Sequence, residues 1–161
     1  MKTLYIIRHA KSSWSFDLKD FDRPLGERGR KDVTRMGKYL AQHYAAPELI
    51  ISSPASRAFY TALFIADQWN YPEERIRLAS SFYHGSPAGI LKELMGLENQ
   101  NSVAIFGHNP GLTDLANNLS DKYLDNISTC GVVGINFNIN NWGQLENSKG
   151  NQFIFLKPKD L

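Results

Sequence analysis

Residues 5–14 read YIIRHAKSSW. The apolar run Leu4–Ile7 stops at a cation and an imidazole, Arg8 and His9, and small polar residues follow. A short apolar run bounded by charge predicts a strand that is buried on both faces. Its polar end is either a plain strand terminus or part of a functional site, and the residues that follow the other strands decide between the two.

Similar apolar runs alternate with helical patterns along most of the chain. Apolar runs predict further strands at 49–51, 75–78 and 102–106, and helical spacing predicts helices at 27–44, 53–69, 86–95 and 110–119. Ser53 is the predicted N-cap of the second helix, with Pro54 in its first turn. This alternation predicts an α/β fold: a three-layer sandwich with a mainly parallel central sheet and helices on both faces.

The last third of the chain has a different pattern. Ile135, Phe137 and Ile139 alternate with asparagines, which predicts a strand buried on one face, and 153–156 predicts a final strand. The end of the chain is therefore predicted to be a C-terminal antiparallel hairpin. With no linker or internal repeat, we expect residues 1–161 to form a single domain.

Two features allow a functional interpretation, but a simpler structural interpretation explains each of them. The aromatic residues Trp14, Phe16 and Phe21 lie in the long irregular segment 8–26, and we interpret them as anchors of that loop rather than as a lid over a substrate. A basic stripe lies opposite the apolar face of the first predicted helix, and we interpret it as a solvated helix face. It consists of Arg28, Lys31, Arg35 and Lys38.

Composition and charge exclude several classes of protein. Hydrophobic residues make up 42% of the chain and charged residues 21%, the balance of a globular protein with a core. A net charge of +2 gives no reason to expect nucleic acid or a membrane surface as a partner. The single cysteine, Cys130, excludes an internal disulfide framework and is predicted to lie in the core. The apolar run near the N-terminus is too short for a signal peptide, so we expect a cytoplasmic protein.

Three of the predicted strands end in polar residues of one chemical character. Arg8 and His9 follow the first strand, Arg57 lies in the first turn of the helix after the second strand, and His108 follows the strand at 102–106. The carboxyl ends of parallel strands share one edge of the sheet, where such folds bind ligands. We therefore expect two arginines, two histidines and two helix N-termini to face one small volume.

This combination predicts a site for a phosphoryl dianion. Arginine presents a planar fork of donors, and helix N-termini present unpaired N–H groups. One histidine, in its protonated form, would add a further donor, and the other would act as nucleophile. A nucleophilic histidine must be neutral; donation from its second ring nitrogen to a backbone carbonyl would fix the tautomer, and the nearby cations would lower its pKa. The expected chemistry is phosphoryl transfer through a phosphohistidine.

These residues resemble the histidine phosphatase (phosphoglycerate mutase-like) superfamily. Arg8-His9-Ala10 is similar to its Arg-His-Gly signature, and Ser52-Ser53-Pro54 with Arg57 is similar to its second arginine motif. Gly107-His108-Asn109 resembles its second histidine motif, and Asp22-Arg23-Pro24-Leu25 resembles the segment that introduces its first helix. The small size points to the SixA-type phosphohistidine phosphatases within it.

The resemblance implies a role for each matched residue. His9 would be the nucleophile, Arg8 and Arg57 would bind the phosphoryl group, and His108 would donate a proton or hydrogen bond to its oxygens. Minor substrate-binding roles fall to three further residues: Ser15, Arg23 and Asn109. The resemblance implies no cofactor and no metal, and the four histidines show no ligand spacing.

This sequence departs from the family pattern in three places. Ala10 replaces the usual glycine, so the backbone there must avoid conformations that only glycine adopts. Gly26 stands where the family often has a helix-capping threonine, which weakens that cap. Residues 80–87, where relatives carry the acid that protonates the leaving oxygen, contain no carboxylate.

The missing acid favours a phosphorus–nitrogen substrate over a phosphate ester. An imidazole leaving group can be protonated near neutral pH, whereas an alkoxide needs a stronger donor. His84 lies in this region, and we interpret it as structural, although as a proton donor it would weaken the inference.

Three functions remain open at this point. The first is hydrolysis of phosphohistidine on a protein through a covalent enzyme intermediate, and the second is phosphatase or mutase action on a small phosphate monoester. The third is a phosphohistidine-binding module with little turnover. The expected partner is accordingly a phosphohistidine-bearing protein or a small phosphorylated substrate, and the sequence gives no oligomeric state.

Overall fold

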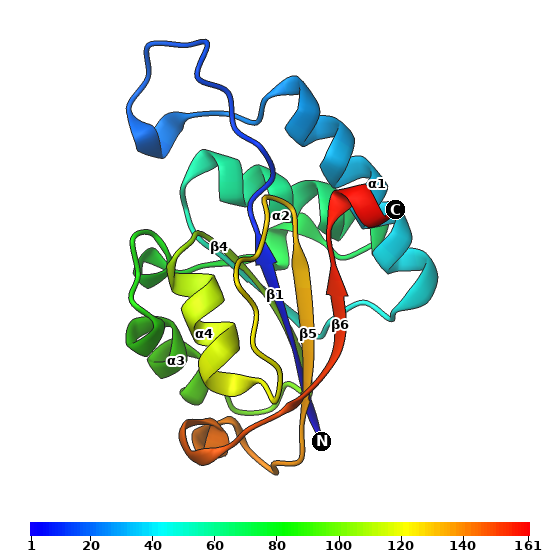
Figure 1. Ribbon diagram of the computed structural model, residues 1–161, viewed down its shortest axis with the longest axis vertical. Helices are drawn as coiled ribbons and strands as arrows, with labels where there is room; N and C mark the ends of the chain where they lie inside the picture. The colour runs from blue at the N-terminus through cyan, green and yellow to red at the C-terminus, as the bar shows by residue number, and fades with distance from the viewer.

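A six-stranded sheet forms the centre of the computed structural model, which describes residues 1–161 (Figure 1). The spatial order is β3-β2-β4-β1-β5-β6. The strands are β1 (Lys2–Arg8), β2 (Leu49–Ser52), β3 (Arg77–Leu78), β4 (Ser102–Gly107), β5 (Val132–Phe137) and β6 (Asn151–Leu156). The first four run parallel to one another, β5 pairs antiparallel with β1, and β6 pairs antiparallel with β5. The predicted mainly parallel sheet and C-terminal hairpin are both confirmed.

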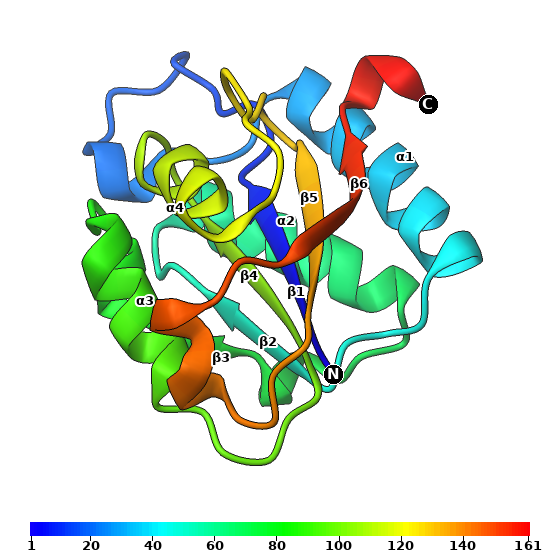
Figure 2. The same ribbon diagram turned by 60° about the horizontal axis from the view of Figure 1, so that its bottom comes forward.

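Four α-helices cover the two faces of this sheet (Figure 2). They are α1 (Glu27–His43), α2 (Ser56–Gln68), α3 (Pro87–Met95) and α4 (Gly111–Leu119). Short 3-10 helices lie in the connections: η1 (Asp20–Asp22), η2 (Glu73–Arg75), η3 (Ser80–Phe82), η4 (Trp142–Asn147) and η5 (Pro158–Asp160). None of the helices has both the length and the apolar character needed to cross a membrane.

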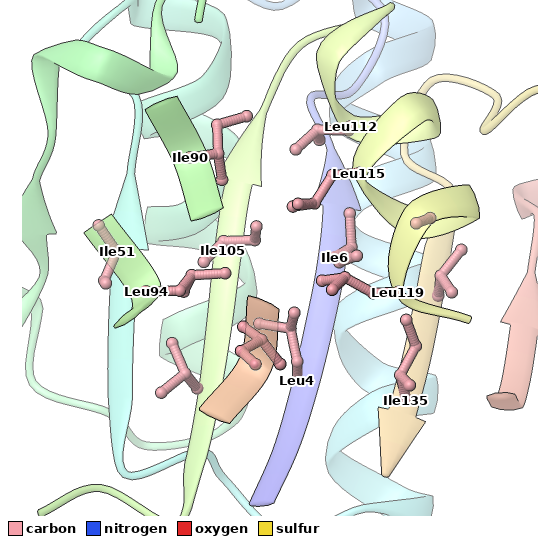
Figure 3. Close-up of a cluster of buried hydrophobic side chains, with 14 of the residues drawn as sticks. Leu4, Ile6, Ile51, Ile90, Leu94, Ile105, Leu112, Leu115, Leu119 and Ile135 are labelled. Carbon is pink, nitrogen blue, oxygen red and sulfur yellow. The ribbon is translucent and has the colours of Figure 1, made fainter. Parts of the chain in front are cut away.

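Alternate residues of the central strands bury against different helices, which explains the three layers. Leu4 and Ile6 of β1 pack in one cluster with α3, α4 and η4 (Figure 3). Tyr5 and Ile7 belong to a second cluster with α1 and α2. Burying a large aliphatic side chain is worth about 1.5–3 kcal/mol, so both faces of β1 contribute to stability. The apolar run that precedes Arg8 is thus the shared centre of both cores.

Most element boundaries agree with the sequence prediction, and α1 illustrates why. Its apolar face, with Val33, Met36 and Leu40, is fully buried, whereas every residue of the basic stripe is exposed, as predicted. Gly26 is the N-cap and offers no side-chain hydrogen bond, which is the weak cap that the sequence indicated.

Three local predictions need correction. The N-cap of α2 is Ala55, not Ser53, because the Ser53 hydroxyl instead contacts His108 Nε2 and accepts a hydrogen bond from Ala55 N. The third strand is only Arg77–Leu78, since η2 takes up the residues before it. The strand β5 begins at Val132 and is buried on both faces except at Asn136, because Val132 packs in one hydrophobic cluster and Val133, Ile135 and Phe137 pack in the other.

Close packing between α1 and the segment that leaves the first strand fixes the path of the chain after His9. A Cβ on Gly29 would lie 2.1 Å from the carbonyl oxygen of Lys11. The same carbonyl accepts a hydrogen bond from Gly26 N at 2.9 Å. A glycine is therefore required at position 29 for α1 to hold residues 10–11 in place.

We expect Gly29→Ala to lower the free energy of unfolding by about 1–3 kcal/mol, because the added methyl must displace backbone rather than a flexible side chain. Denaturant unfolding measures this change. Gly89→Ala in α3 is the matched control, since its new Cβ would make only an ordinary contact at 3.5 Å with Ser86 Oγ. Equal stability of the two variants would contradict the requirement for glycine at position 29.

Candidate active site

The carboxyl ends of β1, β2 and β4 lie at one edge of the sheet, and the predicted residues meet there. His9 follows β1, Arg57 lies in the first turn of α2, and His108 follows β4. The ring centroids of His9 and His108 are 5.2 Å apart. A pocket of about 230 Å³ opens between these elements. Its lining consists of Arg8, His9, Lys11, Ser12, Trp14, Arg23, Arg57, His84, His108, Asn109 and Thr129.

The orientation of the His9 ring is set by its own backbone. Its Nδ1 lies 2.7 Å from the carbonyl oxygen of Ala10. A carbonyl oxygen can only accept, so Nδ1 carries the proton and donates it. In the neutral ring Nε2 then holds the lone pair, as a nucleophile requires. Ala10 adopts no positive φ, and its N–H donates to Thr61 Oγ1 at 2.9 Å, so alanine fits this position.

The surroundings of His9 keep its imidazole neutral. Burial is the largest cause that lowers the pKa of His9 to about 4; the Arg57, Arg8 and Arg23 guanidiniums act in the same direction, and the bond to Ala10 opposes them. The side chain is buried, with only 8% of the residue exposed. At neutral pH His9 is therefore unprotonated in the absence of an anion, as the sequence predicted.

His108 differs from the prediction in its protonation state. Its Nε2 lies 2.8 Å from Ser53 Oγ, and its Nδ1 is buried without a partner. Burial, followed by the influence of His9 and Arg57, lowers the pKa of His108 to about 3. We predicted a protonated histidine as an additional donor, whereas the buried, cationic surroundings favour the neutral ring. It can still offer one N–H donor to an oxyanion.

The two predicted arginines are held by different partners. Arg8 Nη1 donates to the carbonyl of Ile127 at 2.9 Å, and Arg57 donates to the carbonyl and carboxylate of Asp20 at 2.7 and 3.0 Å. Arg57 is 5% exposed, and the Nε atoms of Arg8 and Arg57 are buried without a partner. Buried donors left unpaired by the protein are rare and are typical of a functional site.

The three minor candidates occupy different positions. Arg23 lines the pocket and is 6% exposed. Asn109 also lines it, but its side chain is engaged: Oδ1 accepts from Thr113 N, and Nδ2 donates to Ile127 O. Ser15 is exposed and does not line the pocket, whereas Ser12 does. The structure thus brings Arg23 and Asn109 to the site and leaves Ser15 outside it.

Asp20 and Tyr83 are site residues that the sequence analysis missed. The Asp20 carboxylate accepts hydrogen bonds from Arg23, Arg57 and the Tyr83 hydroxyl. The i,i+3 spacing of Asp20 and Arg23 signals an ion pair. The contact with Arg57 has no such signal, because 37 residues separate the two.

The loop aromatics do not anchor the loop as predicted. Trp14 is 76% exposed and Phe16 is 60% exposed, because the loop projects from the domain instead of packing on it (Figure 1). Trp14 instead covers the Arg23 guanidinium, whose Cζ lies 3.5 Å from the ring centroid. Phe21 is 38% exposed and packs edge-on against Tyr83. Trp14 lines the pocket, and Phe21 packs on Tyr83, whose ring lies 5.5 Å from that of His108, so these two residues form the rim of the pocket.

The remaining histidines and the cysteine have distinct surroundings. His84 lines the pocket and is exposed. Its ring lies tilted against that of Tyr83, and its backbone has a positive φ of 54°. His43 is exposed on α1 and Cys130 is fully buried, both as predicted. No three His, Cys, Asp or Glu side chains gather closely enough to hold a metal ion.

Comparison with known proteins finds a family model that matches the first half of the chain and solved structures of the same fold. Residues 4–80 match the model of the histidine phosphatase superfamily (branch 1). The chain superposes on SixA from Nakamurella multipartitia with a TM-score of 0.86 at 20% identity, covering 98% of this chain and 96% of that one. It superposes on the protein histidine phosphatase SixA complexed with tungstate with a TM-score of 0.84 at 20% identity, covering 98% of both.

Two curated relatives match a smaller part of the chain than these structures do, but at higher identity. An uncharacterised chloroplast protein of Arabidopsis thaliana is 28% identical over 151 residues, 88% of this chain and 69% of that protein. Phosphoserine phosphatase 1 of Hydrogenobacter thermophilus is 33% identical over 98 residues, 58% of this chain and 44% of that protein.

The match to the histidine phosphatase superfamily model thus spans residues 4–80, which hold His9 and Arg57 but not His108. The whole chain has the fold of the SixA structures, as the sequence resemblance implied.

The depressed pKa of His9 makes stability depend on pH in a defined direction. In the unfolded chain the pKa of a histidine is near 6.5, and in the folded protein that of His9 is about 4. Between these values the unfolded state binds more protons, so the free energy of unfolding falls as pH drops from about 6.5 to about 4. Each unit of the difference is worth about 1.4 kcal/mol.

We expect His9→Asn to lose part of this pH dependence, because the variant has no group at position 9 to protonate on unfolding. Urea unfolding at several values between pH 4 and pH 7.5 measures it. His108 contributes in the same direction, so the slope should be reduced and not abolished. An unchanged slope would show that His9 is not desolvated.

Proposed function

We propose that this phosphatase hydrolyses phosphohistidine on a protein through a covalent intermediate on His9. The observation that carries the proposal is the His9 ring itself. Its Nδ1 is committed to the Ala10 carbonyl, which leaves the lone pair on Nε2, and His9 lines a pocket together with Arg8, Arg57 and His108. The tungstate in one SixA structure is an oxyanion that resembles phosphate in shape, and it supports this type of ligand.

The reaction proceeds in two balanced steps. First, the lone pair of His9 Nε2 attacks phosphorus, and the phosphorus–nitrogen bond of the substrate breaks with its electron pair going to the leaving imidazole, which is protonated. Second, water attacks the phosphohistidine on the enzyme, its P–Nε2 bond breaks, and inorganic phosphate leaves with His9 restored. Arg8 and Arg57 stabilise the negative charge on the phosphoryl oxygens in both steps, and His108 supplies a hydrogen bond.

The composition of the pocket supports a phosphorus–nitrogen substrate. No aspartate or glutamate is among the residues that line it. Asp20 lies nearby, but its bonds to Tyr83, Arg23 and Arg57 outweigh desolvation and lower its pKa to about 2, so it holds no proton to give at neutral pH. A leaving group that is protonated without a strong acid fits this site better than an alkoxide.

The rim of the pocket supports a macromolecular substrate. Four large apolar side chains within a short stretch of the loop are exposed: Trp14, Phe16, Leu18 and Phe21. Exposed apolar clusters of this kind are typical of surfaces that contact another protein. A phosphohistidine at the tip of a protein side chain would bring the surface around it against this rim.

A phosphatase for small phosphate monoesters is the second candidate, and one observation favours it. His84 lines the pocket and is exposed, so its imidazole can reach a leaving oxygen as a proton donor. Relatives with small substrates exist, among them phosphoserine phosphatase 1 of Hydrogenobacter thermophilus.

We expect His9→Ala to lower kcat/KM on a phosphohistidine protein by about a thousandfold or more, because the variant lacks the covalent nucleophile. Release of inorganic phosphate measures it. The matched control is His43→Ala, which removes an exposed histidine of α1 outside the pocket and should retain wild-type turnover. Turnover by His9→Ala within tenfold of wild type would contradict a covalent mechanism through His9.

We expect a phosphohistidine protein to be turned over with a higher kcat/KM than an aryl phosphate, because the pocket lacks a carboxylic acid donor.

The double variant Phe16→Ala/Leu18→Ala should raise KM for the phosphoprotein and leave KM for phosphoramidate, a small phosphorus–nitrogen substrate, unchanged. Tyr123→Ala, which removes an exposed aromatic side chain beyond α4, is the control. A preference for the aryl phosphate would select the small-ester phosphatase, and tight phosphate binding without turnover would indicate a binding module.

A further inference from the structure

Asp20 lies between the two most deeply buried cations of the pocket. Its Oδ1 accepts from Arg23 Nε at 3.2 Å and from Arg23 Nη2 at 3.1 Å. Its Oδ2 accepts from Arg57 Nη2 at 3.0 Å and from the Tyr83 hydroxyl at 2.9 Å. Its backbone carbonyl accepts from Arg57 Nη1 at 2.7 Å. Residue 20 thus holds guanidiniums from two separate parts of the chain.

The two guanidiniums need such a partner. The side chains of Arg23 and Arg57 are 8% and 6% exposed, and each is charged. Buried like charges repel strongly in a medium of low dielectric constant, and a carboxylate shared between them offsets that repulsion. Asp20 itself is 41% exposed on its side chain and does not line the pocket. It approaches the arginines from outside, so both remain part of the pocket wall.

A shared carboxylate also limits how the arginines can move. Asp20 occupies both terminal nitrogens of Arg57 through its carbonyl and Oδ2, and one edge of Arg23 through Oδ1. Arg23 Nη1 is further tied to Ser12 Oγ at 2.5 Å, and Trp14 covers its face. A guanidinium has five N–H donors, so each arginine keeps donors for a ligand while its plane is fixed.

We propose that Asp20 is the positioning residue of the phosphoryl pocket: its carboxylate, braced by Tyr83, holds Arg57 and Arg23 side by side so that their remaining donors meet one phosphoryl group. The proposal rests on the proposed function and adds a residue that acts through the two arginines without touching the substrate. Because Asp20 stays ionised, it has no part in proton transfer to the leaving group.

The sign of one measurement separates positioning from simple charge balance. Removing a negative charge beside the pocket should tighten the binding of an anion if Asp20 acts only as a competing counter-charge. It should weaken binding if Asp20 sets the geometry of the donors, because misplaced donors lose their bidentate contacts. Asp20→Asn keeps the shape of the side chain and removes the charge, so it exposes this difference.

We expect Asp20→Asn to weaken binding of inorganic phosphate, measured by calorimetry on the full chain, and to lower kcat/KM on a phosphohistidine protein by about 10- to 100-fold. Asp20→Glu, which restores the charge, should recover part of the phosphate affinity. Asp22→Asn is the matched control, an exposed aspartate in the same 3-10 helix with no ion pair, and should behave like wild type.

A second variant tests the hydrogen bond from Tyr83 to Asp20 without changing any charge. Tyr83→Phe removes the hydroxyl that donates to Asp20 and should weaken phosphate binding in the same direction but by less than Asp20→Asn. In the double variant the two effects should not add, because both act on one network. This keeps the proposal open to test if Asp20→Asn folds poorly, which a thermal melt would reveal.

Two outcomes would overturn the proposal. Tighter phosphate binding by Asp20→Asn would make Asp20 a competitor for the arginines, and affinity equal to that of Asp22→Asn would make it a plain surface residue. The affinity comparison needs no turnover. If the wild-type protein bound phosphate but hydrolysed no phosphohistidine, the proposed function would fail and the role of Asp20 would still be decided.

Discussion

The strands β1, β2 and β4 lie side by side and run parallel, and the arrangement of the site depends on this one constraint. Arg8 is level with Gly107 in the pairing of β1 with β4, and Ser52 is level with Phe106 in the pairing of β2 with β4. The residue that follows each strand therefore emerges at the same height above the sheet. Segments separated by some 50 residues of sequence bring an imidazole after β1, a guanidinium in the first turn of α2 and a second imidazole after β4 to one small volume.

The electrostatic balance of this volume follows from burial. Three guanidiniums, those of Arg8, Arg23 and Arg57, line the pocket, and Asp20 is the carboxylate beside them. Taking cations out of water is costly unless an anion compensates them, so the protein keeps an excess of positive charge that a phosphoryl dianion would satisfy. The same burial and the same cations keep His9 and His108 neutral. A single arrangement thus favours a bound anion and, in the proposed mechanism, keeps the nucleophile ready to react.

Much of the fold and of the site could be predicted from the sequence because the signals are local. An apolar run that ends in Arg8 and His9, or in Gly107 and His108, is visible without knowledge of the fold, and strand–helix alternation predicts that the strands run parallel. The acceptor that fixes the His9 tautomer is also local, since it is the carbonyl of Ala10, the next residue. Such features depend on the chain within one or two residues of the site.

The features that sequence analysis missed are contacts between distant segments. Asp20 meets Arg57 and Tyr83 only because η1, α2 and the segment after η3 converge in three dimensions. Ser53 looked like a helix cap because its spacing to Pro54 is typical of one, but tertiary contact with His108 shifts the start of α2. Trp14 and Phe16 looked like loop anchors because large apolar residues are usually buried, whereas here both remain exposed, Trp14 at the edge of the pocket.

The most direct test of the account is to find the phosphoryl group on the enzyme. The protein would be mixed for milliseconds with a ³²P-labelled phosphohistidine protein, quenched into alkaline denaturant, in which phosphohistidine survives, and digested for peptide mapping. The account predicts label on the peptide that contains His9, linked through Nε2 of the ring. Label on a different residue, or rapid hydrolysis with no labelled enzyme at any time after mixing, would contradict it.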